Sequence, residues 1–247
     1  MTTHDMLDIV RKQLAIDLNC KASDLEGERD GFVFAEAKDH PARRPFLRGE
    51  QYFEMLTMGG PVVVSATPKR LQYAREQLHG KSRDQAFALP FIRGHVIHFL
   101  PDIEAMKCIG PPPGFLYELA QRDQVAALRG EAGFGNAIQN DADHPVQNTL
   151  ALVAKRGDTM AGIAGAFWWS ADMRGIGFDV KPEYRRKGLA AYLVNALTVK
   201  LLLQDIVPVY AVNACNIASQ RVAHRAGYVP AWISDWRVQF EGELRNQ

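Results

Sequence analysis

The residues from Phe178 to Tyr192 place three adjacent cations next to a glycine, and they read FDVKPEYRRKGLAAY. We expect a strand to end before this turn and a helix to begin at Gly188. The start of a helix offers backbone N–H groups with no internal partner and the positive end of the helix dipole. Gly188 lets an anion approach the backbone closely, and Ala190 keeps the first turn small. The pattern therefore predicts a pyrophosphate site.

Two better-known phosphate motifs do not occur in this sequence. It has no GxxxxGK[ST] loop and no GxGxxG dinucleotide fingerprint. A plainer interpretation of Arg185, Arg186 and Lys187 is a solvated basic turn without a ligand, and the sequence leaves that open.

The elements around this turn predict an α+β fold. Hydrophobic patterning indicates strands at Phe115–Leu119, Thr149–Lys155, Met160–Trp169, Arg174–Val180, Ile206–Val212 and Tyr228–Val238, and helices at Asp123–Ile138, Gly188–Gln204 and Asn216–Arg225. An antiparallel sheet that continues as strand-helix-strand-helix-strand contains a crossover connection and is not doubly wound.

The run GPPPG at residues 110–114 predicts a domain boundary, because consecutive prolines lack N–H donors and favour extended backbone. We expect a smaller α/β domain at 1–110, which shapes the substrate site or mediates an interaction, and a second domain at 115–247. In the first domain we expect a helix at Thr3–Leu18, a strand at Gly31–Ala37, a hairpin of Tyr52–Met58 with Val62–Ala66, a helix capped by Thr67, and a capping box of Ser82 with Gln85.

Composition narrows the class of protein. The chain has 247 residues, a net charge of +1 and 47% apolar residues, so we expect no nucleic-acid partner. No apolar run reaches the roughly 18 residues that suggest a membrane span. The three cysteines are far apart and fit neither a disulfide framework nor zinc ligands, so we expect a cytoplasmic protein without a metal.

The spacing Arg185-x-x-Gly188-x-Ala190 resembles the [RQ]xxGx[GA] signature of the GNAT (N-acetyltransferase) superfamily. Asn216-x-x-Ser219, followed by Gly227-Tyr228, matches the second helix of that family. The stretches 134–137 and 229–232 resemble one uncharacterised GNAT subgroup with an extra N-terminal domain. The resemblance implies a GNAT acyl-CoA transferase fold with a mixed, splayed central sheet, preceded by the smaller N-terminal domain.

The resemblance also implies an activity, which is transfer of an acetyl group from acetyl-CoA to a primary amine within a ternary complex. The acceptor would be a small molecule or a peptide. The residues implied in cofactor binding are Phe178, Asp179, Val180, Lys181, Arg185, Arg186, Lys187, Gly188, Leu189, Ala190, Ala191, Tyr192, Asn216 and Ser219. The alternative for Asn216 is that it is only a helix cap, a position at which Asn is favoured.

Catalytic residues are harder to assign, because this sequence departs from the family pattern. The glutamate that many GNATs place at the start of the fourth strand is absent from Met173–Gly177, and the position of the usual tyrosine acid is Ala223. Asp179, Asp172 and Tyr228 are the candidate substitutes. Asp179 could instead cap a turn or pair with a basic neighbour, and a tyrosine in a strand is commonly a core residue.

Several alternatives remain open at this stage. A GNAT fold without the usual base and acid could bind acyl-CoA as a non-catalytic module or sensor. A homodimer is also compatible with the sequence. The basic run Arg43–Arg48 could contact an acidic substrate or form a solvated loop, and Phe167–Trp169 could wall a substrate cleft or lie in the core.

Overall fold

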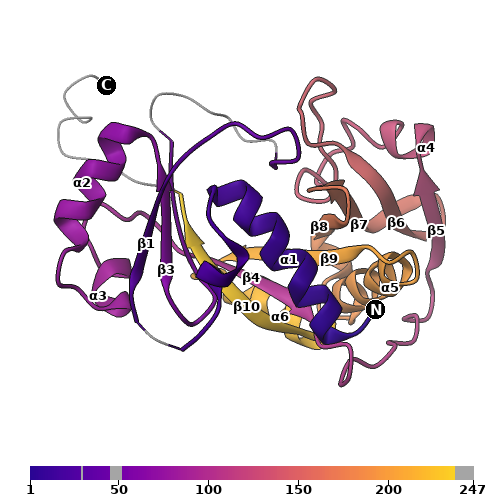
Figure 1. Ribbon diagram of the computed structural model, residues 1–247. Coiled ribbons are helices and arrows are strands. Elements are labelled where there is room, and N and C mark those ends of the chain that lie inside the picture. Colours follow the sequence, from indigo (N-terminus) through magenta and orange to yellow (C-terminus); the bar gives the residue numbers. More distant parts are fainter. Residues whose placement is uncertain (29, 45–51, 237–247) are drawn as a thin grey trace. The chain divides into compact units, whose positions relative to one another are not determined.

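The computed structural model describes residues 1–28, 30–44 and 52–236 (Figure 1). By their contacts these residues fall into two compact units, which we call the C-terminal and the N-terminal unit. The C-terminal unit contains Met1–Leu7, Phe99–Ala211 and Asn216–Pro230. The N-terminal unit contains Asp8–His98, Val212–Cys215 and, among the described residues, 231–236.

A mixed sheet forms the centre of the C-terminal unit, with strand order β10-β4-β9-β8-β7-β6-β5. Neighbours from β5 to β8 run antiparallel, whereas β8 and β9 run parallel. The elements are β4 (Val96–Pro101), β5 (Leu116–Gln121), α4 (Asp123–Ala126), β6 (Asn148–Arg156), β7 (Thr159–Trp168), β8 (Met173–Val180), η2 (Pro182–Tyr184), α5 (Leu189–Leu202), β9 (Val207–Asn213), α6 (Ile217–Arg225) and β10 (Tyr228–Asp235).

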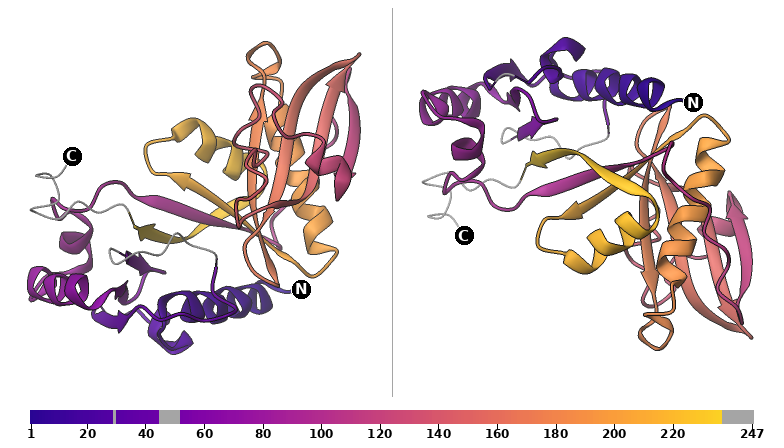
Figure 2. Two further views of the ribbon diagram at one scale, coloured as in Figure 1. Left: turned by 90° about the horizontal axis from the view of Figure 1, so that it is seen from above. Right: turned by 90° about the horizontal axis from the view of Figure 1, so that it is seen from below.

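The two faces of this sheet are covered differently. Helix α5 packs against β6, β7 and β8 (Figure 2). On that face a Cβ at Gly162 would press on Leu193 of α5 and on Val180 of β8, so glycine permits close packing of helix and sheet. The opposite face carries the core cluster that includes Phe134, Ile138 and Ile163. The predicted α+β class with a mixed sheet is therefore confirmed.

The parallel ladder between β8 and β9 is short. It joins Met173 to Val207, Arg174 to Pro208 and Gly175 to Val209, and these two fully described strands make no later pair with each other. The remainder of β8 stays paired with β7 as far as Val180. The two parallel strands thus separate after Gly175, which is the splay that the sequence resemblance implied.

In the N-terminal unit the strand order is β1-β3-β2-β10. Strands β1 and β3 are parallel, and β2 is antiparallel to both β3 and β10. Helices α2 and α3 share an apolar core with this sheet. The elements are α1 (Thr3–Leu18), whose first residues belong to the C-terminal unit, η1 (Ala22–Leu25), β1 (Phe32–Glu36), β2 (Phe53–Thr57), β3 (Val62–Ala66), α2 (Pro68–Leu78) and α3 (Arg83–Phe87).

Local sequence signals predict most of these elements. Helix α1, the β2–β3 hairpin and the capping box of Ser82 with Gln85 are confirmed. Thr67 stands at the N-cap position of α2, but its side chain makes no capping hydrogen bond, so that prediction is wrong.

Of the helical stretches predicted over Asp123–Ile138, only α4 (Asp123–Ala126) is present, and turns follow it, so the prediction is wrong for the remainder. Glycines at positions 130, 133 and 135 oppose helix formation.

The basic run Arg43–Arg48 does not begin as a solvated loop. Arg43 and Arg44 are both buried. The Arg44 guanidinium donates to the carboxylates of Asp17 and Glu54, and the Arg44 backbone N–H donates to Asp17 at 2.8 Å. Although burial opposes the charge, these two carboxylates raise the pKa of Arg44 above its usual value. Residues 45–48 of the run lie outside the described residues.

The segment before the proline run is attached to the C-terminal unit. Buried Asn195 of α5 accepts a hydrogen bond from the Ile109 N–H and donates to the carbonyl oxygens of Lys107 and Ala226. Strands β4, β9 and β10 contribute residues to both units. The predicted division into domains 1–110 and 115–247 stays a prediction.

Candidate functional site

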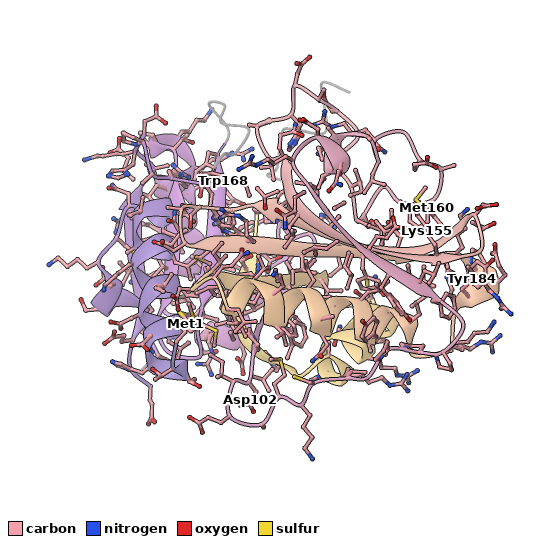
Figure 3. All side chains as sticks on the ribbon, turned by 90° about the vertical axis from the view of Figure 1, so that its right-hand side faces the viewer. Met1, Asp102, Lys155, Met160, Trp168 and Tyr184 are labelled. Carbon is pink, nitrogen blue, oxygen red and sulfur yellow. The ribbon has the colours of Figure 1, made fainter. Side chains whose placement is uncertain are left out.

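The predicted pyrophosphate turn leads from β8 to α5 in the C-terminal unit. Arg185, Arg186 and Lys187 are exposed, and none of them forms an ion pair within the described part of the chain. Figure 3 labels Tyr184, and side chains that end in nitrogen extend into solvent beside it. The Arg185 Nε donates to the Val180 carbonyl at 2.9 Å, which holds the turn against the end of β8.

Backbone donors at the start of α5 add to this positive charge. Gly188 is the N-cap residue with φ of 78°, a left-handed conformation that glycine adopts without strain. The first N–H to reach an acceptor in the helix is that of Tyr192, which donates to the Gly188 carbonyl at 3.1 Å. The preceding N–H groups of Leu189, Ala190 and Ala191 have no intrahelical acceptor, so they are suited to an anion.

A chain of contacts joins β8 to the start of α6. The Phe178 ring stacks on Tyr210 with centroids 6.0 Å apart. The Tyr210 hydroxyl lies 2.7 Å from Ser219 Oγ, and Asn216 Oδ1 accepts from the Ser219 N–H at 3.1 Å. Asn216 is therefore the N-cap of α6, as one alternative predicted. The structure brings Phe178, Ser219 and Asn216 into one network, and their role in cofactor binding stays a prediction.

Two other predicted cofactor residues have structural contacts. The Lys181 ammonium lies 5.6 Å from the centroid of the Phe134 ring. Tyr192 packs edge-on against Tyr117 of β5, with centroids 4.6 Å apart. Their role in cofactor binding stays a prediction.

Asp179 holds a loop in place. Its carboxylate accepts hydrogen bonds from the Asn136 N–H at 2.8 Å, the Asn136 Nδ2 at 2.7 Å and the Ala137 N–H at 3.0 Å. Three donors on one carboxylate fix its orientation. This arrangement favours a positioning role over that of a mobile base.

The other two catalytic candidates differ in accessibility. Asp172 is exposed in the turn before β8, where its carbonyl accepts from the Val207 N–H at 2.8 Å. Tyr228 is buried, and its hydroxyl lies 2.6 Å from Thr198 Oγ1. Burial raises the pKa of Tyr228 well above its usual range. In this conformation Tyr228 is a core residue.

The loop that Asp179 holds lies directly on the sheet. Gly165 and Gly177 face each other across β7 and β8. A Cβ on Gly165 would collide with the Ala137 carbonyl, and one on Gly177 with the Asn136 carbonyl. Asn148 secures the same loop, because its Nδ2 donates to the Ala137 carbonyl at 2.9 Å and its Oδ1 accepts from the Gln139 N–H at 2.7 Å.

A cavity of about 170 Å³ lies beside this loop, lined by Gly135, Asn136, Ala137, Gln139, Val146, Asn148 and Phe167. Among these residues, only Phe167 was expected from the sequence as a wall of a cleft. The sequence did hold a signal for the loop beside this cavity. Small residues occur at alternate positions of two neighbouring strands, and glycine in a strand allows another backbone to approach closely.

The part of the chain that holds this site matches a known family. Residues 115–228 match the model of the acetyltransferase (GNAT) family, a stretch that begins just before β5 and ends at the first residue of β10. No curated protein gives a significant match to this sequence.

Solved structures give distant similarities. An acetyltransferase from the GNAT family from Colwellia psychrerythraea is 14% identical, with a TM-score of 0.46 over 63% of this chain and 61% of that one. A GCN5-related N-acetyltransferase-like protein from Streptococcus suis is 16% identical, with a TM-score of 0.44 over 72% and 71% of the two chains. This chain therefore spans less than two thirds of the Colwellia structure, and neither similarity adds to the assignment from the family model. Residues 115–228 carry a GNAT-family acetyltransferase domain, which is preceded in the chain by an additional N-terminal region.

Proposed function

We propose that this domain transfers an acetyl group from acetyl-CoA to a primary amine within a ternary complex. The observation that carries the proposal is the separation of β8 from β9 after Gly175, on a strand that ends at the exposed basic turn and the free amides of α5. The flank of β8 that β9 leaves unpaired is thus followed, at the end of the strand, by an anion site.

The parts of acetyl-CoA fit these features in order. The pyrophosphate would lie on the N–H groups of Gly188 to Ala191, with Arg186 and Lys187 beside it. The amides of the pantetheine arm would pair with β8 on the flank that β9 leaves open. From Gly175 to Val180 the strand extends about 16 Å, a length that an extended pantetheine arm can follow. The thioester would then lie near Gly175.

Three groups of residues have separate roles in this proposal. The basic turn and the start of α5 bind the cofactor. Asp179 positions the loop at Asn136 and Ala137. A neutral amine attacks the thioester carbonyl, the C–S bond breaks, the thiolate leaves, and the proton of the amine passes to solvent or to the thiolate.

The second candidate function is acyl-CoA binding without catalysis. It is favoured by the full engagement of the Asp179 carboxylate and by the burial of Ala223 at the position of the usual acid.

A thiol-release assay separates the two functions. The intact chain is incubated with acetyl-CoA and a panel of primary amines, and free CoA thiol is measured together with the acetylated amine. Amine-dependent thiol release supports acetyl transfer. Tight CoA binding without release across the panel supports the binding module, and absence of CoA binding contradicts both.

Both properties can be checked on one preparation. CoA binding is measured first by calorimetry, which also shows that the protein is folded and competent. The transfer assay on the same sample then reports the chemistry alone.

A further inference from the structure

The cavity beside the loop at Asn136 lies next to the point where β8 and β9 separate. We propose that it binds the part of the acceptor that lies away from the amine, and so selects acceptors in which that part is an uncharged aromatic ring or carboxamide and carries no carboxylate. This inference rests on the proposed acetyl transfer and names the class of acceptor for the same site.

Strand register places the cavity. Asn148 of β6 pairs with Phe167 of β7, Phe167 pairs with Gly175 of β8, and Gly175 pairs with Val209 of β9. These residues form one row across four strands, and the row ends at the last pair of the β8–β9 ladder. Asn148 and Phe167 line the cavity. A thioester near Gly175 would therefore lie next to the cavity in the sheet.

The position of the cavity along the strands agrees with this placement of the thioester. In Figure 3, Met160 and Trp168 mark the two ends of β7. Tyr184, which directly precedes the basic turn of Arg185 to Lys187, lies toward the Met160 end. Phe167 is adjacent to Trp168, at the other end. The phosphates would thus lie at one end of β7 and β8, and the acceptor cavity would lie at the other end, where a ternary complex needs it.

The lining of the cavity sets the chemistry of its ligand. All seven lining residues are neutral, and they combine the Phe167 ring and Val146 with the carboxamides of Asn136, Gln139 and Asn148. Burying a carboxylate among neutral groups is costly, because no cation compensates for its lost hydration. An amide meets the hydrogen-bonding capacity that these carboxamides retain beyond their contacts within the protein, and an aromatic ring meets apolar surface.

The size of the cavity limits the ligand further. A cavity of roughly 150 Å³ holds a benzene molecule, and this one measures about 170 Å³. It can therefore take one six-membered ring or one carboxamide group.

The walls of the cavity are held before any ligand arrives. Asp179 fixes Asn136 and Ala137, and Asn148 fixes Ala137 and Gln139. A preformed site costs little ordering on binding. Asp179 lies on β8, directly before Val180 and the turn that would bind the pyrophosphate. It therefore connects the cavity wall to the strand along which the pantetheine arm would lie.

A matched pair of acceptors tests the proposed class. Phenethylamine and 4-(2-aminoethyl)benzoic acid have the same distance between ring and amine and differ by one carboxylate on the ring, the part that would enter the cavity. We expect kcat/KM for phenethylamine to exceed that for the ring-carboxylated amine by at least tenfold. Equal values, or a preference for the ring-carboxylated amine, would overturn the inference.

A variant that fills the cavity tests its location. The φ of Gly135 lies outside the left-handed region, and a Cβ there would come no closer than 3.9 Å to a neighbour, Asn140 Nδ2. Gly135→Leu should therefore fold and place its side chain at the cavity. We expect the KM for phenethylamine to rise at least tenfold and the KM for acetyl-CoA to stay within twofold. Gly110→Leu is the matched control, since nothing lies within 4 Å of a Cβ at that exposed glycine, and both values should stay unchanged.

If no amine is acetylated, the proposed function is contradicted. The cavity is then tested separately, by ligand-observed NMR with phenethylamine. Binding that is present in the wild type and lost in Gly135→Leu supports the cavity. No binding, or binding that Gly135→Leu leaves intact, overturns it.

Discussion

Two arginine-containing segments of this chain have similar composition and opposite surroundings. Arg43 and Arg44 are buried in the N-terminal unit, where Arg44 is paired with two carboxylates. Arg185 to Lys187 are exposed in the C-terminal unit next to free helix amides. Adjacent cations thus stabilise the fold in one segment and are available to an external anion in the other, depending on whether the fold supplies carboxylates.

The largest effect should come from the buried segment. Arg44→Ala leaves Asp17 and Glu54 as buried carboxylates without their cation, and such a loss costs about 3–5 kcal/mol. We expect urea denaturation to show that loss of unfolding free energy. Arg186→Ala is the control, and it should change the value by no more than about 0.5 kcal/mol. Similar losses for the two variants would contradict the comparison.

Another buried carboxylate, Asp235, should make stability depend on pH. Asp235 is fully buried, with His95 Nδ1 2.5 Å away. Burial raises the pKa of Asp235 to about 6, although the contact with His95 opposes the shift. A raised acid pKa gives stability that is present below pH ~4 and is lost as the pH rises through about 6.

We therefore expect Asp235→Asn, which stays neutral, to gain stability relative to the wild type between pH 4 and pH 6.5. A shift of about two pKa units corresponds to roughly 2–3 kcal/mol. Denaturation at four pH values in this window measures the difference between the two proteins. A difference that does not change with pH would contradict the assigned pKa.

The exposed segment should affect binding and leave stability unchanged. Arg186→Gln combined with Lys187→Gln should weaken CoA binding about tenfold, because charge-assisted contacts to phosphate are worth about 1.5–3 kcal/mol each when fully formed and less when solvated. The loss should shrink at high salt. Lys200→Gln, at an exposed lysine of the last turn of α5, is the matched control in calorimetry. An equal loss in the control would show that only net charge matters.

Two glycines separate backbone strain from anion binding. Gly188 and Gly157 both have positive φ, 78° and 59°, and at each of them an added Cβ would meet no other atom within 4 Å. Alanine at either position should cost about 1–2 kcal/mol of stability. Only Gly188→Ala should also weaken CoA binding, because its methyl group stands where the pyrophosphate approaches. Equal CoA affinity in both variants would contradict the placement of the anion site at Gly188.

Local signals allowed much of this molecule to be predicted. Helix α1, strands β6 to β8 and helix α5 follow from periodicity and from the residues at their ends. The cofactor turn could be found because all its residues are consecutive in the sequence. The helical stretches expected over Asp123–Ile138 were wrong beyond Ala126, because the apolar residues there belong to a loop that packs on the sheet.

The rest depends on partners that are distant in the sequence. Asp179 holds Asn136 from 43 residues away, and Arg44 meets Asp17 from 27 residues away. Nothing local distinguishes such an aspartate from a catalytic base, or such an arginine from a solvated one. The cavity is equally hidden, since it exists only when Phe167 and Asn148 are paired across two strands.

The most direct test of the central claim compares coenzyme A with pantetheine, which lacks the pyrophosphate and nucleotide. The intact wild-type chain is titrated calorimetrically with each compound at the same ionic strength. If the exposed turn from Arg185 to Ala191 holds the pyrophosphate, coenzyme A should bind at least tenfold more tightly than pantetheine. Equal affinities, or no binding of coenzyme A, would contradict the assignment of this turn as the cofactor site.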